Sequence, residues 1–157
     1  MAILPPAVRT ALIEWLGSSP VKVIYDSNYR PRLWEGQAHA QQITTAMWQR
    51  ANVALPSIDD EMALFDETAE QVERRFAAHL GQGALKRGEE GPMSLGSEVV
   101  QTYEPAGSVV DTTAAGDSFN GGYLGALLSG KTQAQALMAG HCLAASVVQH
   151  RGAITPE

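Results

Sequence analysis

The amino-acid sequence predicts an α/β fold with a mostly parallel sheet covered by helices on both faces. Short apolar, β-branched runs alternate with longer stretches in which apolar residues recur at helical spacing, which is typical of βαβ units. The chain has 157 residues, 45% hydrophobic and 18% charged, a balance that indicates one globular domain over residues 1–157. Ligands of such sheets bind beyond the carboxyl ends of the strands, so the loops at those ends are the first candidates for function.

The first half of the chain alternates between the two patterns. Val8, Leu12 and Leu16 lie at helical spacing and predict a helix that stops before Pro20. The apolar run at 1–4 is predicted to be the end of a buried strand. The elements expected next are a buried strand at 21–25, a helix at 39–52, a brief strand at 53–55, a helix start at 58–66 and a helix at 68–80.

The second half is predicted to begin with a weak strand at 84–86 that leads into a turn at 87–91. Residues 93–95 and 98–103 are expected to pair as a hairpin across Gly96. A short strand at Val109 and Val110 and two helices, at 116–128 and 132–149, complete the chain. The loops at 26–30, 86–91 and 111–117 all follow predicted strands, so we expect them to converge on one crevice.

Composition excludes several classes of partner. The formal net charge of −6 and the pI near 5.2 argue against nucleic acid or an anionic membrane. The single cysteine, Cys142, cannot form an intrachain disulfide, which fits a reducing cytoplasm, and its apolar surroundings predict a small buried side chain. No run approaches the roughly 18 apolar residues of a membrane span.

The segment 109–123, which reads VVDTTAAGDSFNGGY, carries the strongest indication of chemistry. Small side chains at Ala114, Ala115 and Gly116 let a ligand approach the backbone, and the unpaired N–H groups of a helix start attract an anion. Asp117, at the same helix start, could accept the proton of a substrate hydroxyl. The competing interpretation is a helix cap, in which Asp117 or Thr113 only satisfies those N–H groups.

Three further segments offer ligand-binding side chains. In the loop 26–34, Arg30 presents a planar set of donors suited to a carboxylate or phosphate, although an Asx turn with a surface arginine also explains the loop. The segment 86–91 is a Gly-x-x-Gly turn and not a Walker P-loop. Asp60, near other acids, could attract Mg²⁺, but a helix start enriched in acids is the simpler interpretation. We treat His141 and His150 as structural.

In this order the segments resemble the motifs of the ribokinase-like (PfkB-type) sugar kinases. The family core reads Asp-Thr-x-Gly-Ala-Gly-Asp, and this sequence matches it except for Ala114, a residue known there in the ketodeoxygluconate branch. The loop matches Asp-x-Asn-x-Arg, with Tyr29, Pro31 and Trp34 typical of the same branch. Weaker matches are the family's Lys-x-Gly-x-x-Gly at 86–91, its Asn-x-x-Glu at Ser57 to Asp60, and its chain end at Arg151-Gly152-Ala153.

The resemblance, from Ile3 to Pro156, implies a ribokinase-like three-layer αβα sandwich that is incomplete, without the N-terminal strands and lid of the family. It makes Asp117 the general base and the amides of Ala114 to Asp117 the anion hole. The other implied sites are nucleotide contacts at Asn28, Lys86, Gly88, Gly91, Ala114 and Gly116, sugar-acid contacts at Arg30 and Asp117, Mg²⁺ at Asp60, and a monovalent cation such as K⁺ at Asp111.

The implied activity is that of a phosphotransferase that uses ATP and Mg²⁺ to phosphorylate 2-keto-3-deoxygluconate at its primary hydroxyl. Two alternatives stay open: a truncated, non-catalytic fragment that binds nucleotide or assembles with a partner chain, and a sister kinase for fructose, ribose or a nucleoside. Small molecules are therefore the expected partners, with homo-oligomers as a further expectation and no nucleic acid or membrane.

Overall fold

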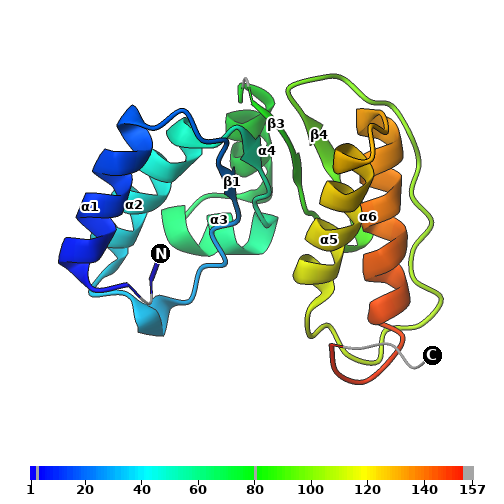
Figure 1. Cartoon of the computed structure of the whole chain (residues 1–157). Helices are drawn as coiled ribbons and strands as arrows, with labels where there is room; N and C mark the ends of the chain where they lie inside the picture. Colours follow the sequence, from blue (N-terminus) through cyan, green and yellow to red (C-terminus); the bar gives the residue numbers. More distant parts are fainter. Residues whose placement is uncertain (3, 80, 154–157) are drawn as a thin grey trace. The chain divides into compact units, whose positions relative to one another are not determined.

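The computed structural model describes residues 1–2, 4–79 and 81–153 (Figure 1). The chain divides into two compact units, Met1–Leu85 and Lys86–Glu157. Among the described helices, none is long and apolar enough to cross a membrane.

The N-terminal unit contains a parallel sheet of three short strands, as the alternation of patterns predicts. Strand β1 (Ile24–Tyr25) pairs with β2 (Val53–Ala54), which pairs with β3 (Gln82–Leu85). In this register Gly83 lies opposite Ala54, and a Cβ at position 83 would overlap the Ala54 carbonyl. The close approach of β2 and β3 therefore requires glycine at this position.

Within the described part of this unit, four α-helices and one short 3-10 helix accompany the sheet. They are α1 (Pro6–Ser18), η1 (Pro31–Leu33), α2 (Gln37–Arg50), α3 (Ile58–Phe65) and α4 (Ala69–Ala77). The boundaries follow local chemistry: Thr68 and Gln71 form a reciprocal capping box at the start of α4, and Asp66 ends α3 in a left-handed conformation. The helices predicted in this half are confirmed to within a few residues; Leu80, at the predicted end of the last one, lies outside the described residues.

Two strand predictions in this unit need correction. The strand expected at 21–25 pairs only at Ile24 and Tyr25, because the side chain of Asn52 accepts the N–H of Val23 in place of a neighbouring strand. Met1, Ala2 and Leu4 form no strand, and Ile3 lies outside the described residues. The carbonyls of Ala2 and Leu4 instead accept hydrogen bonds from the buried guanidinium of Arg9.

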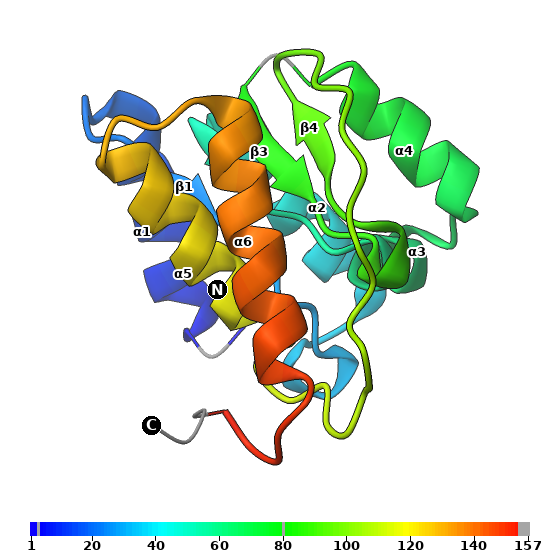
Figure 2. The same ribbon diagram turned by 90° about the vertical axis from the view of Figure 1, so that its right-hand side faces the viewer.

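The C-terminal unit contains η2 (Gly88–Glu90), β4 (Met93–Leu95), α5 (Ala115–Leu128) and α6 (Gln133–Val147). Helices α5 and α6 lie side by side (Figures 1 and 2) and approach closely through glycines. A Cβ at Gly122 would stand 2.6 Å from the Ala139 carbonyl oxygen, and one at Gly140 would stand 2.9 Å from the ring of Phe119. Both helices were predicted from the sequence, and both are confirmed.

The predicted hairpin and the strand at Val109 and Val110 are wrong. Residues 98–103 form no strand, because this segment is fixed to α6 by side chains: Gln101 donates to the carbonyl of Ala134, and Tyr103 packs on the ring of His141. The N–H groups of Val110 and Asp111 both donate to the Val148 carbonyl at the end of α6. The segment between β4 and α5 is therefore an extended crossover along α6 (Figure 2).

The prediction that Cys142 is buried is also wrong, since the cysteine is exposed. Helix α6 turns Gly140 and Leu137 inward, and a residue two positions after Gly140 points to the opposite side of a helix. The apolar residues around Cys142 in the sequence therefore do not indicate whether its side chain is buried.

We expect Gly83→Ala to lower the free energy of unfolding by about 1–3 kcal/mol, because the added methyl must displace the backbone of β2. Gly17→Ala is the matched control: position 17 lies in α1 with no atom near its Cβ, so alanine should stabilise by about 0.5–1 kcal/mol. Urea unfolding of both variants measures the difference. Equal midpoints would contradict the close contact between β2 and β3.

Candidate functional site

The amino end of α5 is open. Ala114 precedes the helix in a left-handed conformation, with φ of 61°, and no side chain caps the helix. The N–H of Ala115 donates to the Thr112 carbonyl at 3.2 Å. The next two N–H groups, of Gly116 and Asp117, have no backbone acceptor among the described residues. Two unpaired donors at the positive end of a 14-residue helix favour an anion.

The conformation of Ala114 is costly for a residue with a side chain. The left-handed region disfavours a non-glycine residue by about 1–2 kcal/mol, and such strain gathers at functional sites. The family core has glycine at this point, and alanine here adopts a conformation that glycine reaches at little cost. The backbone of the loop is therefore specified by its surroundings and not by the intrinsic preference of residue 114.

Asp117 lies in the first turn of α5 and is exposed. The residue at the N-cap is Ala114, so neither Asp117 nor Thr113 caps the helix. The capping interpretation of this segment is therefore wrong. The carboxylate of Asp117 stands at the open helix end, as a general base would need to.

Lys86 reaches the same helix end from the segment that follows β3. Its Nζ donates to Oδ1 of Asn120 at 3.3 Å and lies 3.6 Å from the place that a Cβ of Gly116 would occupy. A cation near a helix amino terminus is repelled by the helix dipole, whereas an anion there attracts both. Lys86 is thus brought to Gly116 and Asp117, which were predicted from a different motif, and the ammonium group together with the helix amino end favours an anionic ligand.

Asp111 fixes the loop that leads into α5. Its Oδ1 accepts the N–H of Thr113 at 2.8 Å, and its Oδ2 accepts the N–H of Gly152 at 2.9 Å. Hydrogen bonds from the Thr113 side chain, and then from the backbone of Gly152 and Thr113, lower the pKa of Asp111 to about 2. The ionised carboxylate therefore ties the loop before α5 to the turn after α6.

The turn at 87–91 is held by its own side chains and by Tyr103. Gly88 and Gly91 both have positive φ, of 58° and 76°, and Nε of Arg87 donates to the Gly91 carbonyl at 3.1 Å. A Cβ at Gly91 would stand 2.5 Å from the ring of Tyr103. The positive φ of both residues and the contact of Gly91 with Tyr103 thus favour glycine, whether or not a nucleotide contacts the turn.

A groove of about 350 Å³ lies between the crossover segment and α6, and the sequence did not predict it. One wall comes from Thr102 and residues 104–107, and the other from α6, including His141 and Cys142. The imidazole Nε2 of His141 donates to the Glu104 carbonyl at 2.7 Å and joins the two walls. The available signal was a second stripe on α6 at helical spacing, formed by Met138, His141, Cys142, Ala145 and Ser146.

In the N-terminal unit, the loop after β1 brings Asn28, Arg30 and Asp60 together. Asn28 has a left-handed backbone and donates its N–H to the carboxylate of Asp26, so the Asx turn considered from sequence is present. Oδ2 of Asp60 accepts the N–H of Tyr29 at 3.0 Å, and Oδ1 pairs with the guanidinium of Arg30 at 3.4 Å. The side chains of Asn28 and Arg30 are both exposed, and these contacts anchor the backbone that carries them.

At the two predicted cation sites, the carboxylate oxygens already form hydrogen bonds within the protein. Both carboxylate oxygens of Asp60 accept protein donors, and both oxygens of Asp111 do the same. Across the described part of the chain, no group of three or more His, Cys, Asp or Glu side chains could hold a metal ion. The assignments of Mg²⁺ to Asp60 and of a monovalent cation to Asp111 therefore stay predictions.

A family model and two similar proteins indicate the same family of carbohydrate kinases. The model of the pfkB family of carbohydrate kinases matches residues 4–157. The chain is 37% identical over 167 residues to 2-dehydro-3-deoxygluconokinase of Escherichia coli strain K12, covering 100% of this chain and 54% of the relative. It is 39% identical over 164 residues to the protein of that name from Haemophilus influenzae, covering 98% of this chain and 52% of the relative.

The fold is shared with a solved kinase structure. Aminoimidazole riboside kinase from Salmonella enterica, solved with aminoimidazole riboside and an ATP analogue, superposes with a TM-score of 0.79 at 24% identity. The match covers 97% of this chain and 55% of that structure. The chain thus has the ribokinase-like α/β fold and spans about half the length of the relatives it matches.

We expect low pH to weaken the contact through which Asp111 links the loop before α5 to the turn after α6. Because its pKa is lowered in the folded chain to about 2 from 3.8, its contribution to stability is present above about pH 4 and is lost as the pH falls towards 2. Asp111→Asn should therefore lose less stability than wild type between pH 5 and pH 2, measured by urea unfolding at several pH values. Parallel stability curves for the two proteins would contradict this role of the carboxylate.

Proposed function

Because this chain belongs to the pfkB family of carbohydrate kinases, we propose that it carries the phosphoryl-transfer site of a sugar-acid kinase that acts on 2-keto-3-deoxygluconate. The observation that supports the proposal most is the open amino end of α5, where two unpaired N–H groups, Lys86 and Asp117 meet. The substrate follows the names of the relatives, and the exposed guanidinium of Arg30 suits a sugar carboxylate.

In the proposed reaction the γ-phosphoryl group of ATP lies against the N–H groups of Gly116 and Asp117. The ammonium of Lys86 offsets the charge of the phosphates, and the carboxylate of Asp117 accepts the proton of the primary hydroxyl of the sugar acid. The hydroxyl oxygen then bonds to the γ-phosphorus while the bond from that phosphorus to the bridging oxygen of ADP breaks. Positioning and preorganised charge supply most of the rate enhancement.

We assign the nucleoside of ATP to the groove between the crossover segment and α6. Its volume of about 350 Å³ suits a ligand of this size. The wall at 102–107 continues directly into Asp111 and the amino end of α5, so phosphates at α5 and a base in the groove share one continuous segment of chain.

A second candidate function is nucleotide binding without turnover. It is favoured by length, since the chain covers 54% and 52% of the two kinases compared above. If the sugar acid is bound mainly by parts of the domain that this chain does not share, ATP binds, but the primary hydroxyl of the sugar acid is not positioned for transfer.

The only cysteine of the chain lies on the wall of the groove and is exposed, so it reports occupancy directly. We expect saturating MgATP to slow alkylation of Cys142 at least about threefold, because a bound nucleotide covers the thiol. In Lys86→Ala the protection should need a higher MgATP concentration. Alkylation at the same rate with and without nucleotide, in a chain that binds MgATP by calorimetry, would place the nucleoside elsewhere.

Asp117→Asn tests the reaction itself. We expect turnover of 2-keto-3-deoxygluconate, followed by ADP release, to fall at least about 10²-fold, because an amide cannot accept the proton. MgATP affinity should change only a few-fold. Glu70→Gln, which alters an exposed carboxylate on α4, is the control that should leave turnover unchanged. Undiminished turnover in Asp117→Asn would refute the base, whereas MgATP binding without turnover in wild type would favour the second candidate.

A further inference from the structure

Two consecutive carboxylates of α3 hold the loop after β1 on both sides of Asn28. Oε1 of Glu61 accepts the hydroxyl of Ser27 at 3.2 Å, and Oδ2 of Asp60 accepts the N–H of Tyr29 at 3.0 Å. Ser27 and Tyr29 are the two neighbours of Asn28. The residue predicted to contact a nucleotide is therefore fixed from each side by one carboxylate.

The backbone between these two anchors is strained. Asn28 has a φ of 41°, in the left-handed region, and its N–H donates to Oδ1 of Asp26 at 3.1 Å. Such a conformation persists only where the surroundings determine it. The surroundings are supplied by the two carboxylates and by the side chain of Tyr29, which is 7% exposed and packs with Ala40 and Leu64.

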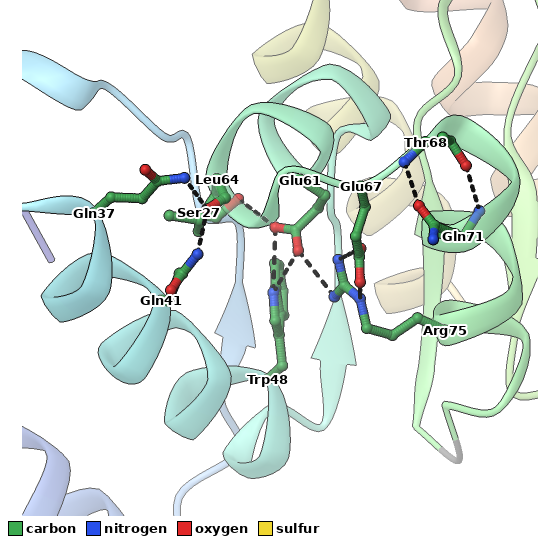
Figure 3. A network of polar contacts seen from close by, with 10 residues as sticks. All are labelled: Ser27, Gln37, Gln41, Trp48, Glu61, Leu64, Glu67, Thr68, Gln71 and Arg75. Atoms are coloured by element: carbon green, nitrogen blue, oxygen red, sulfur yellow. Dashed lines mark hydrogen bonds and ion pairs between the residues drawn. The ribbon is translucent and has the colours of Figure 1, made fainter.

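Glu61 can serve as an anchor because its charge is compensated inside the unit. The side chain is fully buried, and burial raises the pKa of its carboxyl, whereas the guanidinium of Arg75 acts in the opposite direction. Nη1 of Arg75 lies 3.1 Å from Oε2, and the indole N–H of Trp48 donates to both oxygens at 3.3 Å (Figure 3). With its hydrogen bonds satisfied, the carboxylate is held in one place.

Arg75 is itself held rigidly. Its guanidinium pairs with Glu67 at 2.6 Å (Figure 3). The guanidinium also lies over the rings of Phe65 and Phe76, at 4.5 Å and 4.8 Å. A rigid network thus runs from α4 through Glu61 to the loop. The acids of α3 were considered from sequence as a helix start, which the structure confirms, or as a Mg²⁺ site, which stays a prediction; Asp60 and Glu61 also contact the loop.

We propose that Asp60 and Glu61 are positioning residues that preorganise the 26–30 loop, so that Asn28 and Arg30 meet the ligand in one fixed orientation. The proposal rests on the proposed function only in that Asn28 and Arg30 contact MgATP or the sugar acid. The competing explanation is that Glu61 merely ties α3 to α4 and Trp48, with Ser27 as an incidental neighbour.

Ser27→Ala separates the two explanations, because it removes the contact with the loop and leaves Trp48 and Arg75 on Glu61. We expect amide hydrogen exchange of Asn28 and Tyr29, measured by NMR in the whole chain, to rise about tenfold or more. The N–H of Leu55, which pairs with Tyr25 in the sheet, should change less than about twofold. Ser27→Thr keeps the hydroxyl and should restore protection.

Two variants complete the comparison. Glu61→Gln should raise exchange at Asn28 and Tyr29 as Ser27→Ala does. Arg74→Ala removes an exposed pair with Glu70 one residue from Arg75, and it should change neither amide. If exchange at Asn28 and Tyr29 is unaffected by Ser27→Ala and rises in Glu61→Gln only together with that of Leu55, the role of Glu61 is structural and the inference fails.

Measurements of ligand affinity test whether the order of the loop affects binding. With calorimetry against MgATP and, separately, against 2-keto-3-deoxygluconate, Ser27→Ala should weaken at least one of them about 3- to 10-fold. Faster exchange with unchanged affinity for a ligand that wild type binds would overturn the proposal. If wild type binds neither probe, the proposed function fails, and the exchange data alone decide whether the two carboxylates order the loop.

Discussion

The two unpaired N–H groups at the amino end of α5 are the constraint on which the rest of the C-terminal unit depends. They stay unpaired because Ala114 turns the chain through a left-handed conformation and no side chain caps the helix. The crossover segment is bound to Val148, and Asp111 is bound to Gly152, so the loop cannot relax into an ordinary cap. The arrangement favours an anion, and the proposed phosphate ligand would offset the repulsion between Lys86 and the positive end of the helix.

The N-terminal unit holds the 26–30 loop differently. There the left-handed residue is Asn28, and buried or paired carboxylates of α3 hold its neighbours. In both units, backbone strain at one residue is balanced by carboxylates that accept N–H or O–H groups. This preorganisation lets a small loop present polar groups without first having to become ordered.

Much of the fold could be predicted from residue patterns in the sequence. The helices and the parallel strands follow from helical spacing and β-branched runs, which are local properties. The anion site at 114–117 was predicted from small residues at a helix start, and it stays a prediction, as does the role of Lys86. The predictions that failed depended on distant partners: residues 98–103 look like a strand but are fixed to α6 by Gln101 and Tyr103, and Cys142 lies in apolar sequence but on the outer face of its helix. The pairing of Glu61 with Ser27 joins residues 34 positions apart, so no local pattern indicates it.

The most direct measurement of the central claim is an NMR titration of the ¹⁵N-labelled chain with MgATP. If the open end of α5 binds the phosphates, the amide resonances of Gly116 and Asp117 will show the largest shifts, and those of helix α4 will show none. Inorganic phosphate should move the same two resonances at higher concentration. Saturable MgATP binding that leaves Gly116 and Asp117 unmoved would contradict the account.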